Sequence, residues 1–198
     1  AFMTCRVISL APQDFGSRQY FDFYSSHGME SEAAGLVAIQ GNEYLKPQKF
    51  DVASIVESVI KEVTKRGMRL ERMGHGWTCM PLGLPSESWD QYNRPLPASK
   101  QKWLAKVDGN RKLWRDVPLN TNLCYSNPQV RLAVIDCIAR YAKDNPHVDA
   151  IHFWLADWFN NNCECRRCRQ ARPADYFVQM LNELDEKLTV DRSETRII

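Results

Sequence analysis

Three cysteines crowd into one short stretch of the chain, "NNNCECRRCRQ", as Cys163, Cys165 and Cys168. Thiolates bind Zn²⁺ tetrahedrally, and four ligands close a structural site. The spacing therefore predicts three ligands of a structural zinc ion. We expect Cys124 to supply the fourth, with His75 as the second choice.

Two other uses of these thiols remain open, namely one disulfide or free thiols within a loop. The chain has seven cysteines. Because this number is odd, a closed set of disulfides is not implied. The arginines around the thiols would offset the negative charge of a thiolate site; they are Arg166, Arg167 and Arg169.

Three titratable residues follow segments that are predicted to be strands. Asp157 ends the apolar run "IHFWLAD", Glu43 follows "QGN", and His75 lies in "GHGW". A carboxylate or imidazole at such a position can act as general acid, base or nucleophile. Each also has a structural alternative, as a cap, a solvated loop carboxylate or a satisfied histidine. We expect Asp157, Glu43 and His75 to be the catalytic candidates.

Aromatic and amide side chains occur beside these residues. Trp77 and Trp158 could stack on sugar rings, because a pyranose presents an apolar C–H face, and Asn42 could bind a hydroxyl. The alternative for each tryptophan is that it covers the core. We expect Trp77, Trp158 and Asn42 to bind substrate.

The elements that must position these residues alternate between strand and helix. Apolar runs predict strands at 4–10, 35–40, 68–74 and 149–157, with a further strand beginning at 196–198. Helical spacing of apolar residues predicts helices at 17–28, 51–67, 127–145 and 174–188, and 77–122 is expected to be a long loop. This order predicts an α/β fold with parallel strands and outer helices, either a partial (β/α)8 TIM-like barrel or a small open sheet.

In such a fold the loops after the strands share one rim, where active sites are built. The loops that carry Glu43, His75, Asp157 and the clustered cysteines would converge there with Cys124. The sequence therefore predicts a sugar-binding cleft on this rim, with its loops locked together by metal or disulfide.

Length and composition limit the alternatives. The 198 residues predict one domain, and we expect it to be a fragment of a longer barrel, since the chain begins at Ala1 and ends as an apolar run begins. The net charge of +2 argues against a dedicated nucleic-acid binder. No apolar run is long enough to span a membrane, and no signal peptide is visible. Half a barrel would leave edges and an apolar face open, which favours a homodimer or pairing with the missing half.

The motifs "GHGW", "WLAKVDGNRK", "NLCYSNPQVR" and "FWLADWFNNNCECRRCRQARPADYFVQMLNEL" together resemble a bacterial family of unknown function. Its members look like α-glucuronidase-type glycoside hydrolase barrels. The resemblance implies a TIM-barrel core, a carbohydrate ligand, and a secreted or periplasmic location. A second carboxylate beside Asp157 would be Glu43, Glu164 or a residue of the missing half.

Two other functions are kept beside the glycoside hydrolase relative. The thiol cluster and its arginines could form a zinc knuckle that binds a protein or nucleic acid. The chain could also be a sugar-binding relative without catalytic activity. Neither composition nor spacing identifies the substrate.

Overall fold

The computed structural model describes residues 7–8, 31–32, 60–61, 63–65, 69–72, 76–86, 89–156 and 158–198. The chain divides into two compact units. The first unit comprises Ala1–Met73, Asn145–His152 and Glu194–Ile198, and the second comprises Gly74–Asp144 and Phe153–Ser193. Each unit is therefore assembled from segments that are separated in the sequence.

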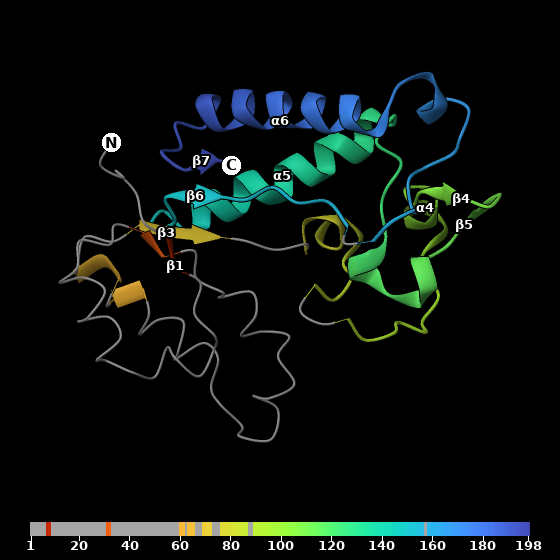
Figure 1. The fold of residues 1–198 in the computed structure, drawn as a ribbon, viewed down its shortest axis with the longest axis horizontal. Coiled ribbons are helices and arrows are strands. Elements are labelled where there is room, and N and C mark those ends of the chain that lie inside the picture. Colours follow the sequence, from red (N-terminus) through yellow and green to blue (C-terminus); the bar gives the residue numbers. More distant parts are fainter. Residues whose placement is uncertain are drawn as a thin grey trace. The chain divides into compact units, whose positions relative to one another are not determined.

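The first unit holds a parallel five-stranded sheet (Figure 1). Its strands, in the order β1-β2-β3-β6-β7, are β1 (Val7–Ile8), β2 (Ser31–Glu32), β3 (Arg69–Arg72), β6 (Ala150–Ile151) and β7 (Arg196–Ile197). Every neighbouring pair is parallel. Parallel neighbours need crossover connections, which are usually helices. The α/β class with parallel strands that the sequence predicts is confirmed.

The described strands coincide with most of the predicted ones. The predicted strands at 4–10, 68–74, 149–157 and 196–198 contain β1, β3, β6 and β7. The second described strand lies at Ser31–Glu32, whereas the predicted strand at 35–40 and the predicted helix at 17–28 lie outside the described residues. Residues 60–61 and 63–65 are helical, as predicted, and Val63 is buried.

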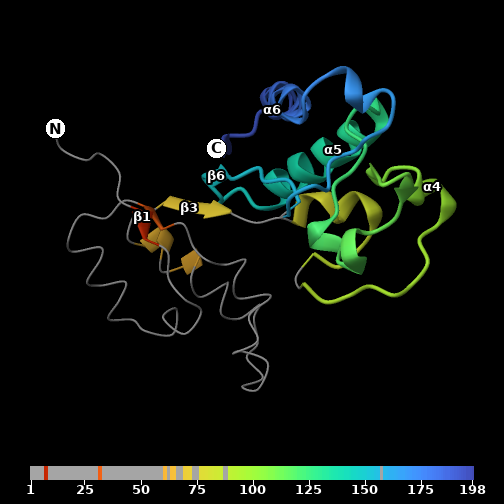
Figure 2. The same cartoon turned by 45° about the vertical axis from the view of Figure 1, so that its right-hand side comes forward.

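Two long helices dominate the second unit and pack against each other (Figures 1 and 2). They are α5 (Pro128–Asp144) and α6 (Pro173–Val190), which confirms the predicted helices at 127–145 and 174–188. Proline suits both N-termini because its missing N–H has no helical partner there. The side chain of Asn127 accepts the N–H of Gln129 at 3.0 Å and so caps α5.

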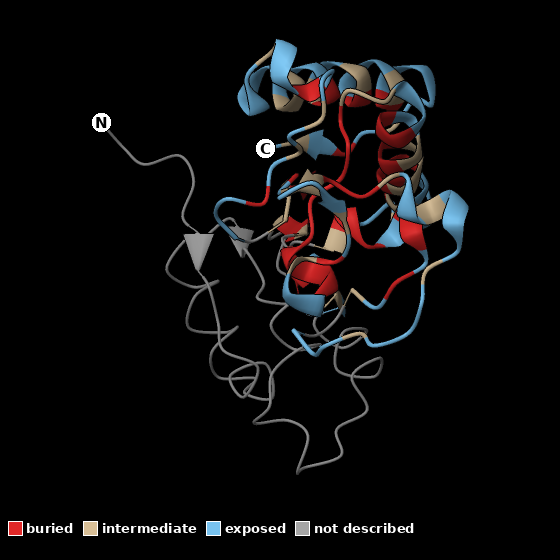
Figure 3. Cartoon of the chain, turned by 90° about the vertical axis from the view of Figure 1, so that its right-hand side faces the viewer, coloured by how far each residue is buried: buried red, intermediate tan, exposed pale blue. Residues whose placement is uncertain are grey.

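Each helix buries one stripe of apolar side chains. On α5 the fully buried side chains are Val130, Val134 and Ile138, and Tyr141, one turn further along, is half-buried. On α6 the buried side chains are Met180, Leu184 and Leu188, on one side of the helix (Figure 3). Phe177 and Leu181 are only half-buried. Met180, Leu184 and Leu188 share one face of the helix because they follow one another at a spacing of four.

The segment predicted as a long loop at 77–122 is folded into short elements. They are η3 (Gly76–Thr78), η4 (Met80–Leu82), α4 (Ala98–Gln101), β4 (Lys106–Val107), β5 (Asn110–Arg111), η5 (Trp114–Asp116) and η6 (Pro118–Asn120). Buried apolar side chains occur towards both ends of the segment, among them Leu82, Leu104 and Leu119, whereas residues 89–103 are exposed or half-buried. The segment therefore contributes to the core of the second unit.

Strands β4 and β5 form an antiparallel hairpin, in which Lys106 pairs with Arg111. The turn is Asp108–Gly109, and both residues have positive φ, at 49° and 79°. Two residues of positive φ are what a type I′ hairpin turn requires, and Asp-Gly is a favoured sequence for it. The turn thus places Lys106 and Arg111 beside each other, which matters for the thiol cluster.

Candidate functional site

Four cysteines of the second unit bring their sulfur atoms together. The Sγ atoms of Cys124, Cys163, Cys165 and Cys168 all lie within 4.8 Å of one another. The Sγ of Cys124 is 3.7 Å from that of Cys165 and 3.8 Å from that of Cys168. The sulfur atoms that the sequence singled out as ligands are thus within reach of one ion.

The spacing fits a tetrahedral metal site. Zn–S bonds of about 2.3 Å place the sulfurs of a regular tetrahedron about 3.8 Å apart. The two distances from Cys124 match that value. A disulfide would need about 2.05 Å, and all four cysteines are free thiols. Four soft sulfur donors at this spacing suit Zn²⁺ and leave no open position for a substrate.

Two segments that each precede a helix supply the ligands. Cys124 follows the bridge between Leu104 and Leu123, and its N–H donates to the carbonyl of Trp103 at 2.8 Å. The other three lie just before α6, with Cys168 opening the short helix η7 (Cys168–Gln170). A structural ion here would therefore tie the start of α5 to the start of α6.

The β4–β5 hairpin supports the second of these segments. The N–H of Lys106 donates to the Sγ of Cys163 at 3.2 Å, and the Lys106 carbonyl accepts the N–H of Glu164 at 2.7 Å. At the turn, the N–H of Asp108 donates to the Glu164 carboxylate at 3.1 Å. Backbone N–H donors aimed at sulfur stabilise thiolates and orient metal ligands.

Two side chains that the sequence reasoning missed also contact the thiols. The Oγ of Ser126 lies 3.6 Å from the Sγ of Cys124 and 3.1 Å from that of Cys168. An Nη of Arg111 donates to the Sγ of Cys124 at 3.7 Å, and the other donates to the carbonyl of Leu104. The Asp-Gly turn was the signal that could have placed Arg111 near the cluster.

The arginines expected to offset the thiolate charge are exposed. Arg169 instead lies 4.0 Å from the carboxylate of Glu164 at the surface. Arg111 is half-buried and offsets the thiolate charge in their place, because its guanidinium contacts the Sγ of Cys124 directly. A positive charge at that point reduces the repulsion among neighbouring thiolates.

The thiols of the cluster differ in pKa. Hydrogen bonds from Cys163 and Cys168 lower the pKa of Cys124 far below its usual range. The same hydrogen bond with Cys124 is the largest cause that raises the pKa of Cys168. The hydrogen bonds therefore stabilise Cys124 as a thiolate, which is the form that binds a metal. Outside the cluster, burial raises the pKa of Cys79 to about 12.

An exposed aromatic pair lies ahead of the cysteines in the same unit. Trp158 and Phe159 retain 40% and 67% of their surface, and their rings stack at 5.3 Å with an interplanar angle of 18°. The guanidinium of Arg115 lies 4.9 Å from the centre of the Trp158 ring. Arg115, Asp116 and Asn160 all have positive φ, a conformation that Asp and Asn tolerate and that is strained for Arg115.

Trp77 occupies a different environment. It retains 4% of its surface and packs edge-on against Tyr141, with the ring centres 5.4 Å apart. A tryptophan so buried covers the core, which was the structural alternative for this residue. Four other site residues lie outside the described residues, namely Asn42, Glu43, His75 and Asp157.

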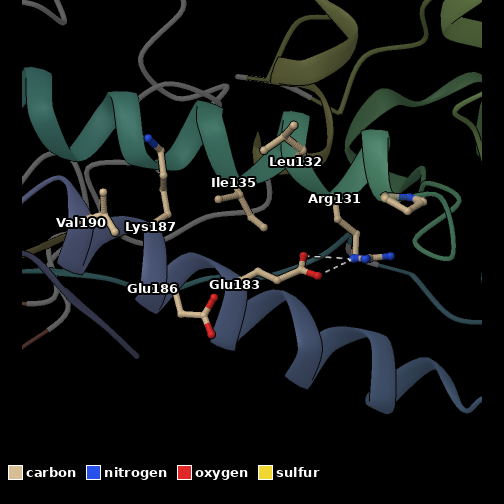
Figure 4. Close-up of a pocket in the computed structure, with 8 residues that line it drawn as sticks. Arg131, Leu132, Ile135, Glu183, Glu186, Lys187 and Val190 are labelled. Atoms are coloured by element: carbon tan, nitrogen blue, oxygen red, sulfur yellow. Dashed lines mark hydrogen bonds and ion pairs between the residues drawn. The ribbon is translucent and has the colours of Figure 1, made fainter.

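A groove of about 470 Å³ runs between α5 and α6 (Figure 4). Arg131 and Glu183 point towards each other across it, and Leu132 and Val190 are exposed along it. Nothing in its lining resembles a catalytic constellation, so the thiol cluster and the aromatic pair remain the candidate sites.

The chain is similar in structure to solved enzymes that are named trehalulose synthase and isomaltulose synthase. It matches trehalulose synthase MutB in complex with Tris at a TM-score of 0.52 and 12% identity, covering 98% of this chain and 44% of that chain. It matches an inactive double mutant of MutB at 0.53 and 13% identity, with the same coverage. It matches isomaltulose synthase from Erwinia rhapontici NX5, in complex with D-glucose, at 0.52 and 12% identity, covering 98% and 43%.

These likenesses concern the fold. They confirm a partial barrel of the α/β class, because nearly the whole chain superposes on less than half of each enzyme's length. They do not support the α-glucuronidase-type subgroup.

No protein-family model and no curated protein matches the chain. Among the described residues, the helices are too short or too polar to cross a membrane.

Proposed function

We propose that this chain is part of a carbohydrate-active barrel, a relative of glycoside hydrolases that binds a sugar on an aromatic surface held in place by a structural zinc site. The observation that carries the proposal is the exposed stacked pair Trp158–Phe159 with Arg115 beside it. The fold supports it, because solved enzymes of similar fold are named for acting on sugars.

The aromatic pair has the properties of a sugar platform. A solvent-exposed pair of stacked rings offers an apolar surface to the C–H face of a pyranose. Exposure of large aromatic side chains is costly unless something covers them, and such patches mark binding sites. Arg115, whose guanidinium lies over the Trp158 ring, adds donors to this surface that could bind sugar hydroxyls.

The thiol cluster supports the platform mechanically. Asp157, Trp158 and Phe159 lie within six residues of Cys163 in the sequence. A Zn²⁺ ion held by Cys124, Cys163, Cys165 and Cys168 would supply no chemistry beyond fixing these loops, since four protein ligands close it. Asp157 is then the candidate for proton transfer or nucleophilic attack, with Glu43 or a residue of the rest of the barrel as its partner.

Binding of oligosaccharides to the whole chain tests the proposal. Tryptophan fluorescence and affinity electrophoresis would be run with isomaltulose, malto-oligosaccharides and glucuronoxylan fragments. Trp158→Ala should weaken binding by about two- to tenfold, because one stacked aromatic contributes roughly 0.5–1.5 kcal/mol. Trp89→Ala is the matched control, since Trp89 is also exposed, at 48%. Equal binding by both variants would remove the platform from the proposal.

One observation favours a second function. Arg166, Arg167 and Arg169 are exposed on the segment that carries three of the thiols. A zinc knuckle with such a surface could bind phosphate groups of a nucleic acid or an acidic protein. Affinity of that kind falls steeply as salt rises, whereas sugar stacking hardly responds. A steep salt dependence of ligand binding would therefore favour the knuckle.

A further inference from the structure

We infer that Glu71 and His152 form a second polar site of the barrel, in which His152 contacts a hexose ring and Glu71 positions it. The inference rests on the proposed carbohydrate function and adds two residues to the candidate site residues. Both residues belong to the first unit.

The two side chains meet across neighbouring parallel strands. Glu71 on β3 pairs in register with Ala150 on β6, and His152 follows β6 directly. The Nε2 of His152 lies 2.9 Å from the Oε2 of Glu71. The ladder continues past β6, because the N–H of His152 donates to the carbonyl of Arg72 at 2.8 Å. The pair therefore sits at the carboxyl end of two adjacent strands.

Both faces of these strands combine buried apolar residues with polar ones. Ala150, which is fully buried, and His152 are two residues apart and share one face of the sheet with Glu71. Leu70, Arg72 and Ile151 lie on the opposite face, where Leu70 and Ile151 are almost fully buried. The polar residues of both faces lie towards the carboxyl ends of the strands, where the sites of parallel βα folds are built.

The degree of burial distinguishes the two roles. The side chain of Glu71 retains 5% of its surface and that of His152 retains 16%. Glu71 is also 3.6 Å from an Nη of Arg69, so its second oxygen has a cationic neighbour. A buried carboxylate that holds one ring nitrogen fixes the orientation of an imidazole, and the more exposed imidazole is the group that a ligand reaches.

A purely structural reason for the pair is weak. Taking a carboxylate out of water is costly, and a buried ion pair is often no more stabilising than apolar residues of the same volume. Titratable partners at the carboxyl ends of parallel strands are instead typical of functional sites. A histidine so placed can donate to, or accept from, a sugar hydroxyl without any change in the carboxylate that orients it.

Acylation of histidines by diethyl pyrocarbonate, mapped by peptide mass spectrometry on the whole chain, tests the inference. The probe is deoxynojirimycin, an iminosugar with the shape of glucose. With the probe at about ten times its dissociation constant, acylation of His152 should slow by about tenfold. The exposed His147 serves as the internal control and should react at an unchanged rate.

Glu71→Gln tests the positioning role, because the amide keeps the size of the side chain but loses its charge. Protection of His152 by the probe should fall at least about fivefold, as a charge-assisted hydrogen bond contributes on the order of 1.5 kcal/mol or more. Glu186→Gln, at an exposed position of α6, should keep full protection. The wild-type measurement decides the question even where Glu71→Gln fails to fold.

The outcomes separate this inference from the proposed platform. Absence of protection at His152 in the wild-type chain overturns the hexose site, whatever Trp158 does. Protection at His152 together with equal sugar binding by Trp158→Ala and Trp89→Ala keeps the hexose site and removes the platform. Protection that survives in Glu71→Gln leaves His152 as a ligand contact and overturns the role of Glu71.

Discussion

The Nε of Arg131 lies 3.1 and 3.0 Å from the two carboxylate oxygens of Glu183, so one guanidinium joins α5 to α6. The same guanidinium donates through Nη1 to the carbonyl of Tyr125 at 2.9 Å. Tyr125 follows Cys124 directly. Arg131 thus connects the packing of the two helices to the loop that presents the first thiol.

Loss of Arg131 should destabilise the second unit. Arg131→Met leaves the half-buried carboxylate of Glu183 and the buried carbonyl of Tyr125 without this donor. We expect the free energy of unfolding to fall by about 1–3 kcal/mol, the range for leaving a buried hydrogen-bonding group without its partner. Urea unfolding measures this, with Arg140→Met at an exposed position of α5 as the control. Equal midpoints for the two variants would contradict the coupling.

Removal of a metal ion bound by the four thiols should lower the free energy of unfolding of the chain. Purified protein should contain one zinc ion per chain by elemental analysis, and Co²⁺ substitution should give thiolate charge-transfer and tetrahedral ligand-field bands. Cys163→Ser should lose the ion and several kcal/mol of unfolding free energy, on the order expected for structural zinc. Cys137→Ser, half-buried and outside the cluster, should keep the ion. Retention of zinc by Cys163→Ser would show that the thiols are not its ligands.

The backbone donor from the hairpin can be removed on its own. Lys106→Pro deletes the N–H that lies 3.2 Å from the Sγ of Cys163 but leaves all four sulfurs in place. Partners outside the ligand shell typically contribute about tenfold or more to metal affinity. We therefore expect about a tenfold faster loss of zinc to a competing chelator, while Lys106→Ala, which keeps the N–H, behaves as wild type. Similar rates for both variants would assign the hairpin no part in holding the metal.

Cys79 should make the chain sensitive to alkaline pH. Burial raises the pKa of its thiol from 9.0 to about 12, so above pH 9 the unfolded chain loses a proton that the folded chain keeps. The stabilisation is complete below pH 9 and is lost as pH rises towards 12, by on the order of a few kcal/mol. The free energy of unfolding, measured from pH 8 to 11, should fall less steeply in Cys79→Ala than in wild type. Parallel slopes would show that Cys79 is not protected by burial.

Sequence patterns predicted the elements that depend on local periodicity. The helices α5 and α6 followed from apolar spacing and proline, and Cys124 was placed near Cys163 because both precede helices in one βα arrangement. The contact between Arg111 and Cys124 was missed, since it depends on how a short hairpin folds back. The Glu71–His152 pair was missed as well. It depends on the register of β3 against β6, which no pattern within either strand specifies.

The boundaries of the compact units have a consequence for dissecting the protein. The chain passes from one unit to the other at Met73, at Asp144, at His152 and at Ser193. A single truncation anywhere between Met73 and Ser193 therefore removes sequence from both units. Deleting β7 from the C-terminus, for example, strips an edge strand from the parallel sheet although that strand comes after the last helix of the other unit. Fragments meant to isolate either unit would need to be joined from non-adjacent pieces or expressed together.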